Sequence, residues 1–132
     1  MNRYNDYTRL TRHWLRRYND FRVAVVDMKK EVNEREKRLN QEEQLERLKA
    51  DINKIELVLD RIDRALDALD DETAALLKER FIKKESCVKI AFKFNFSESC
   101  IRQKSAKAVE RMALIMFGMK AMPKHTSFVF AI

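Results

Sequence analysis

The sequence predicts an all-α fold, in which a long coiled-coil helical hairpin is followed by a small helix-turn-helix domain. The chain of 132 residues contains one Gly and one Pro, so few positions favour a turn or a break in a helix. Charged residues make up 37% of it and aromatic residues 9%, a balance typical of long charged helices rather than of sheets or disordered chains. Apolar residues also recur in steps of three and four, which is the helical period.

The first long helix is predicted over residues 4–39. Apolar and semi-apolar residues form a nearly unbroken coiled-coil seam there, with one lapse at Arg35. The seam consists of Tyr4, Tyr7, Thr11, Trp14, Tyr18, Phe21, Val25, Met28, Val32 and Leu39. Its aromatic half suits either internal packing or docking on a partner or second subunit. The residues assigned to such an interface are Tyr7, Trp14, Tyr18 and Phe21.

A basic cluster lies beside the aromatic half of this seam. Its members are Arg9, Arg12, His13, Arg16 and Arg17. Such a cluster is typical of the solvated flank of a packed helix, and contact with phosphates or with a protein is the alternative.

A second seam follows without a lapse, at Leu45, Leu48, Ile52, Ile55, Leu59, Ile62, Leu66 and Leu69. The two seams are out of phase, because the first would continue at positions 42 and 46. Either the chain turns back at residues 39–41 to form an antiparallel hairpin, or a stammer overwinds one continuous helix. We favour the hairpin, since Asn40 tolerates the left-handed conformation that ends helices and the seams can cover each other. Residues 1–69 are therefore predicted to be a coiled-coil region for oligomerisation or docking.

Three shorter helices are predicted within residues 70–117. Asp70 is the N-cap candidate of the first, which starts with acidic side chains and extends from Asp71 to about Ile82. Ser86 and Ser97 are the N-cap candidates of the next two helices. A tight turn at Asn95-Phe96 separates these two helices, and the last has a packed stripe formed by Ile101, Ser105, Ala108 and Met112.

The opposite face of the last helix carries small, amide and basic side chains, as a helix that reads the major groove of DNA requires. Arg can form a bidentate contact with guanine, and Gln can do so with adenine. Residues 80–132 hold eleven basic and three acidic side chains, which localises the attraction for polyanions. The predicted base-reading residues are Ser99, Arg102, Gln103 and Lys107. The predicted contacts to the DNA backbone are Ser86, Lys89, Lys93, Ser97, Lys104 and Arg111.

Residues 71–112 resemble region four of the primary bacterial sigma factors, the domain that binds the −35 promoter element. The resemblance rests on LDDETAALLKERF at 69–81, on Ala91, Phe96 and Ser97, and on the ungapped pair of segments IRQ and AKA at 101–103 and 106–108. It implies that Arg102 and Gln103 face promoter DNA. Glu98 and Ser99 depart from the pattern, which has a basic and then an acidic reader, so we expect a site other than the standard −35 element.

The whole arrangement resembles the small late-gene transcription activators of Gram-positive phages and prophages, the RinA and ArpU type. Long helices ending in IDRALDALDDE precede a sigma-like helix-turn-helix that ends in RMALIMFG. This resemblance implies a phage-encoded regulator that binds a promoter and recruits or assists host RNA polymerase.

Residues 118–132 are predicted to form an apolar tail. Met116 and Met119 belong to a methionine stripe typical of a core or a subunit interface, although Gly118 can end the helix early. The final SFVFAI is strand-like and is expected to pack on the chain or on a second subunit.

Val88 and Phe92 form an apolar stripe away from the predicted core face. We expect Phe92 to pack on the upstream helices or on the tail, and a contact with a partner such as RNA polymerase is the alternative.

Several classes of protein are not expected from this sequence. It has no Gly-rich phosphate loop and no nucleophile with a nearby base, so we expect no enzyme and no cofactor. Cys87 and Cys100 lack the spacing of a zinc site, so we expect reduced thiols and no metal. No apolar run follows a basic start and none approaches ~18 residues, so we expect a cytoplasmic protein that does not bind membranes.

The leading hypothesis is a sequence-specific DNA-binding transcription regulator. Its expected partners are double-stranded DNA and host RNA polymerase, and the coiled coil also allows a homodimer. One alternative is a DNA-packaging recognition subunit similar to a phage small terminase, which also joins a helix-turn-helix to a coiled coil. The other is an adaptor that mimics sigma region four and binds protein only.

Overall fold

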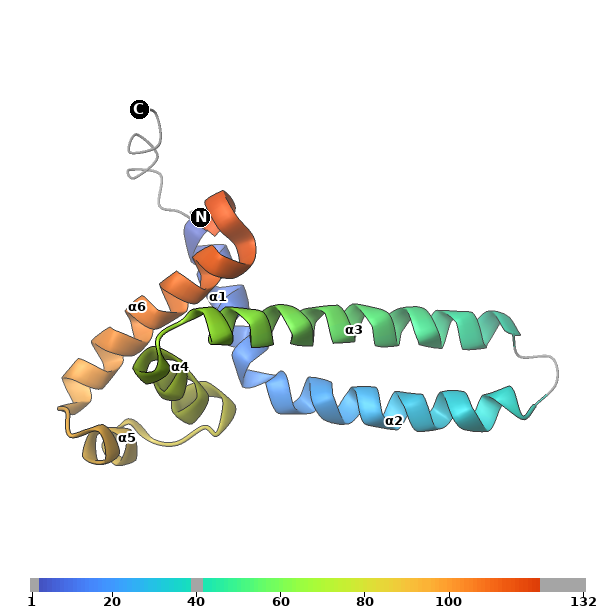
Figure 1. Ribbon diagram of the computed structural model, residues 1–132, viewed down its shortest axis with the longest axis horizontal. Coiled ribbons are helices and arrows are strands. Elements are labelled where there is room, and N and C mark those ends of the chain that lie inside the picture. Colours follow the sequence, from blue (N-terminus) through green and yellow to red (C-terminus); the bar gives the residue numbers. More distant parts are fainter. Residues whose placement is uncertain (1–2, 39–41, 122–132) are drawn as a thin grey trace.

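The computed structural model describes residues 3–38 and 42–121, and this part of the chain is all-α, without a strand (Figure 1). The α-helices are α1 (Arg3–Arg16), α2 (Tyr18–Glu36), α3 (Glu42–Ala68), α4 (Asp71–Leu77), α5 (Cys87–Phe94) and α6 (Glu98–Phe117). A π-helical turn, η1 (Lys78–Ile82), continues α4, and a short 3-10 helix, η2 (Gly118–Ala121), follows α6. The predicted all-α class is therefore confirmed.

Helices α2 and α3 form the long helical hairpin, which projects from the other helices in Figure 1. Its seam is closed by Val25 and Val32 from α2 and by Ile52 from α3, all of which are buried. Lys29 pairs with Glu56 across the hairpin at 3.1 Å. The hairpin was the favoured prediction and is confirmed, while its predicted turn at residues 39–41 lies outside the described residues.

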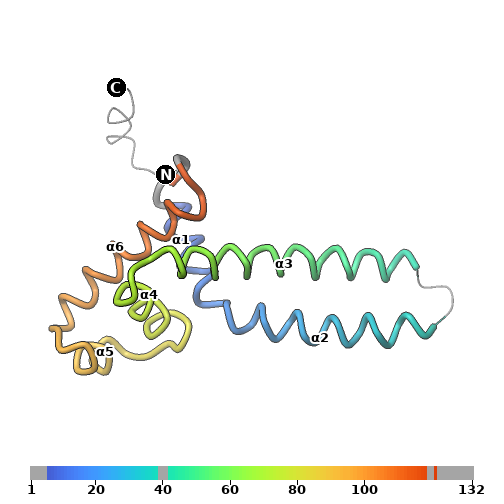
Figure 2. The backbone as a smooth tube through the Cα atoms, in the orientation of Figure 1, coloured from blue at the N-terminus to red at the C-terminus, as the bar shows by residue number. Residues whose placement is uncertain are grey.

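The sequence predicted one long helix over the first seam, and this prediction is wrong. The chain bends at Arg17, which separates α1 from α2 (Figure 2). Arg17 adopts φ −95° and ψ 1°, between the helical and extended regions. Its amide donates to the carbonyl of His13 at 3.0 Å, and its carbonyl accepts from the amide of Phe21 at 2.8 Å. The bend thus keeps these backbone hydrogen bonds while α1 leaves the hairpin. Spacing alone could not reveal it, because a three-four repeat does not specify which partner each residue packs against.

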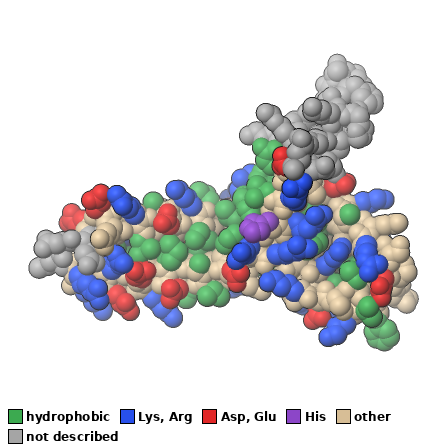
Figure 3. Space-filling view, turned by 180° about the vertical axis from the view of Figure 1, so that it is seen from behind, with side chains coloured by type: hydrophobic (Ala, Val, Ile, Leu, Met, Phe, Trp, Pro, Cys, Tyr) green, Lys and Arg blue, Asp and Glu red, His purple; other side chains and the backbone are tan. Residues whose placement is uncertain are grey.

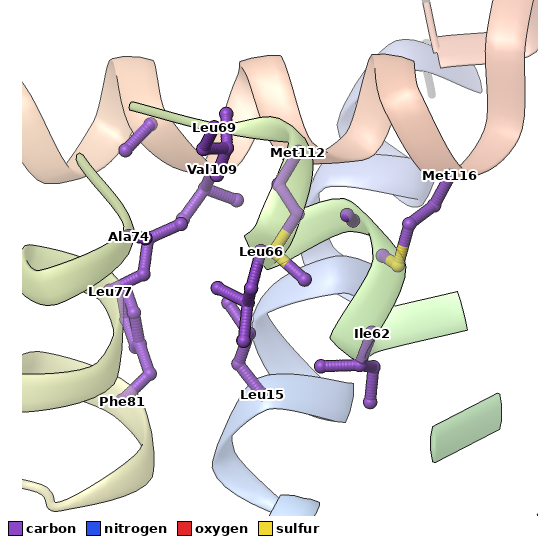
Figure 4. Packing of buried hydrophobic residues seen from close by; sticks show 12 residues of the cluster. Leu15, Ile62, Leu66, Leu69, Ala74, Leu77, Phe81, Val109, Met112 and Met116 are labelled. Atoms are coloured by element: carbon purple, nitrogen blue, oxygen red, sulfur yellow. The ribbon is translucent and has the colours of Figure 1, made fainter. Parts of the chain in front are cut away.

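The main hydrophobic core lies where α1, α3, α4, η1 and α6 meet (Figure 4). Leu15 from α1, Ile62 from α3, Leu77 from α4 and Met112 from α6 are all fully buried. The other buried members are Ala65, Leu66, Leu69, Ala74, Phe81, Ala108, Val109 and Met116. The core crosses residue 69, so the predicted coiled-coil region and the predicted helix-turn-helix domain share one core.

The aromatic residues of α1 pack within the chain. The rings of Tyr7 and Trp14 lie 5.1 and 5.3 Å from the ring of Phe117, at the end of α6. Arg61 of α3 lies over the Trp14 and Phe117 rings and donates a hydrogen bond to the carbonyl of Met116. This arrangement ties α1, α3 and the last turn of α6 together.

The residues predicted for a partner or oligomer interface therefore differ in their availability. Tyr7, Trp14 and Tyr18 are partly buried by the chain itself, and Met116 is buried in the main core. The hydroxyl of Tyr18 donates to Asp63 of α3 at 2.6 Å. Phe21 is half-buried, and the side chain of Met119 lies outside the described residues.

Helix α6 ends at Phe117, directly before the glycine that was predicted to end it early. Gly118 has φ +66°, a conformation that L side chains rarely adopt. After it, η2 packs against α1 and buries Ala121. Residues 122–132, including the predicted strand-like segment, lie outside the described residues.

Replacing Leu15 with Ala tests the docking of α1. Because the side chain is fully buried in the main core, we expect the free energy of unfolding to fall by about 2–5 kcal/mol. The matched control is Leu57→Ala on α3, where the side chain is 63% exposed and the expected change is about 0.5 kcal/mol or less. Urea denaturation followed by circular dichroism measures both. Equal losses for the two variants would contradict the position of α1.

Candidate nucleic-acid interface

Helices α5 and α6 are joined by a turn whose local geometry follows the sequence prediction. Ser86 caps α5 by accepting a hydrogen bond from the amide of Lys89 at 3.2 Å, and Ser97 caps α6 through the amide of Cys100 at 3.1 Å. Asn95 is left-handed, with φ 60° and ψ 44°, which ends α5. Both serines use their hydroxyl oxygens as cap acceptors, and their hydroxyl protons remain available to donate to a phosphate.

A small apolar cluster fixes the angle between these two helices. Leu76 of α4, Ile90 and Ala91 of α5, and Ile101 of α6 are buried together. Phe96 of the turn packs against them, and its amide donates to the carbonyl of Ala91 at 2.9 Å. The orientation of α6 is therefore determined by packing and by the turn.

The buried stripe of α6 is the predicted one. Ile101, Ser105, Ala108 and Met112 are at most 2% exposed, and the hydroxyl of Ser105 donates to the Ile101 carbonyl at 2.6 Å. The four residues predicted to read bases lie on the exposed side of the same helix. These are Ser99, Arg102, Gln103 and Lys107. The structure thus brings the predicted base-reading residues together on one solvent-facing surface, which we call the reading face.

Most of the cations near the reading face already have acidic partners. On α6 itself, Arg102 pairs with Glu98 one turn earlier at 3.3 Å. Lys104 pairs with Glu72 of α4 at 3.4 Å and also lies over the Phe96 ring. Lys107, in contrast, has no ion pair within the described residues.

The predicted backbone-contact cations of α5 are paired as well. Lys89 lies 3.9 Å from Glu85, and Lys93 lies 2.7 Å from Glu79. On the face that Figure 3 shows, Lys and Arg side chains gather on the half of the molecule away from the hairpin tip, whereas both signs occur along the hairpin. This face is therefore basic, but several of the cations predicted to contact DNA are balanced by acidic neighbours.

Asp70 links the start of α4 to α6. Its carboxylate accepts hydrogen bonds from the amide and hydroxyl of Thr73 and pairs with Arg111 at 3.0 Å. The contacts with Thr73, followed by that with Arg111, lower the pKa of Asp70 to about 2. Arg111, which was predicted to contact the DNA backbone, thus also holds α6 on the N-terminus of α4.

Glu79 is the polar residue that the sequence analysis missed. Its side chain is 10% exposed and binds Lys93 of α5 at 2.7 Å and Lys83 at 3.0 Å. These hydrogen bonds, first that from Lys93, lower the pKa of Glu79. No sequence signal marks it, because a glutamate within an amphipathic helix is usually solvated.

Phe92 does not pack on the upstream helices, as one expectation had it, and the tail that was the other expected contact lies outside the described residues. Its side chain is 91% exposed, and that of Val88, one turn earlier on α5, is 60% exposed. The inner face of α5 is already filled by Ile90 and Ala91, which leaves this second stripe in solvent.

A second basic cluster forms where α1 meets η1. Arg16 and Arg80 lie over the ring of Phe81, at 5.6 and 5.2 Å from its centroid. Burial and then the charges of Arg16 and Arg80 lower the pKa of Arg12. The predicted basic flank of the first seam thus gains Arg80 from a distant part of the chain.

Comparisons with known proteins found no match to this chain among protein-family models, curated proteins or solved structures. Within the described ranges, no three His, Cys, Asp or Glu side chains converge in a way that could hold a metal ion. No described helix is both long and apolar enough to cross a membrane.

Asp70→Asn tests the link between α4 and α6 through pH. Asn keeps the capping acceptor but lacks the charge that Arg111 pairs with, so we expect the variant to be less stable at neutral pH. Because the folded pKa of about 2 lies below the ordinary 3.8, this advantage of Asp70 should disappear as pH falls from 3.8 to about 2.

The measurement is the difference in the free energy of unfolding between the two proteins across this pH range. Asp51→Asn, at an exposed position on α3, controls for the loss of one negative charge. A difference that stays constant down to the acid limit would contradict the role given to the charge of Asp70.

Proposed function

We propose that this protein is a sequence-specific DNA-binding transcription regulator that inserts α6 into the major groove. The observation that carries the proposal is the reading face, on which Gln103 and Lys107 are exposed opposite a fully buried stripe and Arg102 is exposed at the edge of the same face. A helix that is capped, fixed by packing and polar on its free side is what direct readout of base edges requires. On this proposal α5 and α6 are a helix-turn-helix, with α6 as its recognition helix.

The roles of the side chains follow from their chemistry. Arg102 and Gln103 present donors and acceptors that match guanine and adenine, respectively. Ser86 and Ser97 sit at the N-termini of α5 and α6, where hydroxyl groups and helix ends favour phosphate. Among the cations predicted to contact DNA, Lys107 is the one that has no acidic partner within the described residues.

Magnitudes indicate that the ion pairs do not prevent binding. The pair between Arg102 and Glu98 is largely exposed, and such pairs contribute about 0–1 kcal/mol. A good bidentate contact with guanine discriminates by about 1–3 kcal/mol. Exchange of Glu98 for a guanine edge is thus favourable for Arg102, although Glu98 then remains close to the DNA and opposes binding.

The kind of DNA site, the protein partner and the activating role are proposed from the sequence resemblance. Similarity to sigma region four supports a promoter as the site and host RNA polymerase as the partner. The further likeness to phage late-gene activators supports an activating role in the bacterial cytoplasm. Exposed Phe92 and Val88 offer an apolar surface for a protein contact beside the proposed DNA-binding helices.

The double variant Arg102→Ala, Gln103→Ala tests base reading. After selection of bound sites from random DNA, we expect wild type to prefer a defined sequence at physiological salt. We expect the double variant to bind the selected site roughly 10- to 100-fold more weakly and to lose the preference. A gel-shift titration measures both affinities.

Arg47→Ala is the control for charge, because Arg47 is exposed near the hairpin tip. It should bind the selected site as wild type does. Absence of any sequence preference in wild type, or undiminished binding by the double variant, would refute base reading and favour an adaptor that binds protein through Phe92.

Glu98→Gln should increase affinity for the selected site by about two- to tenfold. The change frees Arg102 from its ion pair and removes a negative charge from the N-terminal turn of α6. Gel shift at two salt concentrations measures the effect, which should be smaller at high salt. Weaker binding by this variant would mean that Glu98 itself contacts the DNA.

A further inference from the structure

Three arginines converge where α1 meets η1, and we call Arg12, Arg16 and Arg80 the arginine cluster. Arg16 and Arg80 both lie over the Phe81 ring, at 5.6 and 5.2 Å from its centroid, so their guanidinium groups are close to each other. Burial, and then the charges of these two arginines, lower the pKa of Arg12, which is therefore near both. The fold thus brings like charges together from distant parts of the sequence.

No carboxylate of the chain balances this cluster. None of its three arginines has an ion pair within the described residues. Acidic residues close by in sequence are engaged elsewhere. Glu79 of η1 binds Lys93 and Lys83, and Asp20 of α2 pairs with Arg17. Like charges gathered without a counter-charge repel one another, so an anion from outside the chain would stabilise them.

Two members of the arginine cluster belong to a row of cations along α1. Arg9, Arg12 and Arg16 recur in steps of three and four, which places them on one face over about 10 Å of helix. This face is a shallow groove lined by Asp6, Arg9, Leu10, Arg12, His13 and Arg16. Along each strand, DNA presents one phosphate per about 3.4 Å of its axis. The row therefore fits an extended polyanion better than a single small ion.

The position of the arginine cluster favours DNA as this polyanion. Arg80 follows Glu79, whose carboxylate holds Lys93, so the cluster adjoins α5 of the proposed helix-turn-helix. Helix α1 lies behind α3 in Figure 1, and Figure 3 shows that rear side with Lys and Arg side chains gathered away from the hairpin tip. The guanidinium group also matches phosphate, because its planar fork can donate two parallel hydrogen bonds to phosphate oxygens.

We propose that the arginine cluster binds the phosphate backbone of double-stranded DNA and supplies a sequence-independent part of the affinity. Its guanidinium groups donate to phosphate oxygens, while the reading face discriminates between sequences. This inference rests on the proposed function, because the duplex is the one that α6 is proposed to read. It adds a DNA contact on α1 and η1, outside the helix-turn-helix.

The double variant Arg12→Gln, Arg16→Gln tests this contact. Each lost phosphate contact lowers the slope of log affinity against log salt by about 0.9, so we expect the slope to fall by about two. We expect the Kd to rise roughly tenfold or more, by equal factors for the selected site and for a random-sequence duplex, because phosphates carry no sequence. Fluorescence anisotropy of the labelled duplexes at several salt concentrations measures both quantities.

Two controls separate DNA binding from overall charge and from folding. Arg38→Gln with Arg47→Gln removes the same charge near the hairpin tip and should leave the Kd and the slope unchanged. Circular dichroism melts should show that the Arg12→Gln, Arg16→Gln protein is at least as stable as wild type, because it has lost like-charge repulsion. Should it unfold, Arg12→Gln alone gives the same test with a loss of slope of about one.

The possible outcomes distinguish this contact from base reading. Unchanged Kd and slope on both duplexes would overturn the proposal, and binding of polyglutamate by wild type but not by the double variant would then assign the cluster to an acidic protein. A loss confined to the selected site would also overturn it, because a backbone contact acts on every sequence. Absence of sequence preference in wild type would instead refute base reading by α6, while the result on the random-sequence duplex would still stand.

Discussion

The structure depends on the burial of side chains from α1, α3 and α6 in one core. Neither the α2–α3 hairpin nor the α4–α6 unit would be stable alone. A two-helix hairpin has one narrow seam, and the α4–α6 unit is too small to enclose many apolar residues. Ile62 and Leu66 extend the seam of the hairpin directly into the cluster that holds Met112 and Met116. The C-terminal half of α6 is thereby anchored in the main core, while its N-terminal half packs on α4 and α5 through Ile101 and exposes only its other side to solvent.

Much of this organisation could be predicted from the residues. Ser86, Ser97 and Asp70 were identifiable as caps because short polar side chains before apolar periodic segments satisfy free amides. The buried stripe of α6 followed from helical geometry, since its members are separated by single turns. The phase shift between the seams marked a break in the coiled-coil pattern, and a hairpin was favoured there over a stammer in one continuous helix.

The sequence pattern could not predict which of several similar surfaces or charges a side chain contacts in the folded chain. Leu15 lies beside the predicted seam, yet it is fully buried because α1 leaves α2 and packs on α6 and η1. The same limitation applies to charge. Glu79 and Lys93 are far apart in sequence and individually unremarkable, and their pairing depends on how η1 and α5 pack. The exposed Phe92 went against the ordinary expectation that a large aromatic side chain is covered.

The acidic partners around the reading face have a consequence for the thermodynamics of DNA binding, on the proposed function. A free lysine gains affinity when phosphate binding releases condensed counterions, an entropic gain that shrinks as salt increases. At Lys104 and Arg111 a carboxylate of the chain already neutralises the cation, so binding a phosphate releases counterions of the DNA but leaves that carboxylate bare beside it. Such a surface gains little from non-specific sites. Its affinity therefore depends more on the base edges that Arg102 and Gln103 reach than on the density of phosphates.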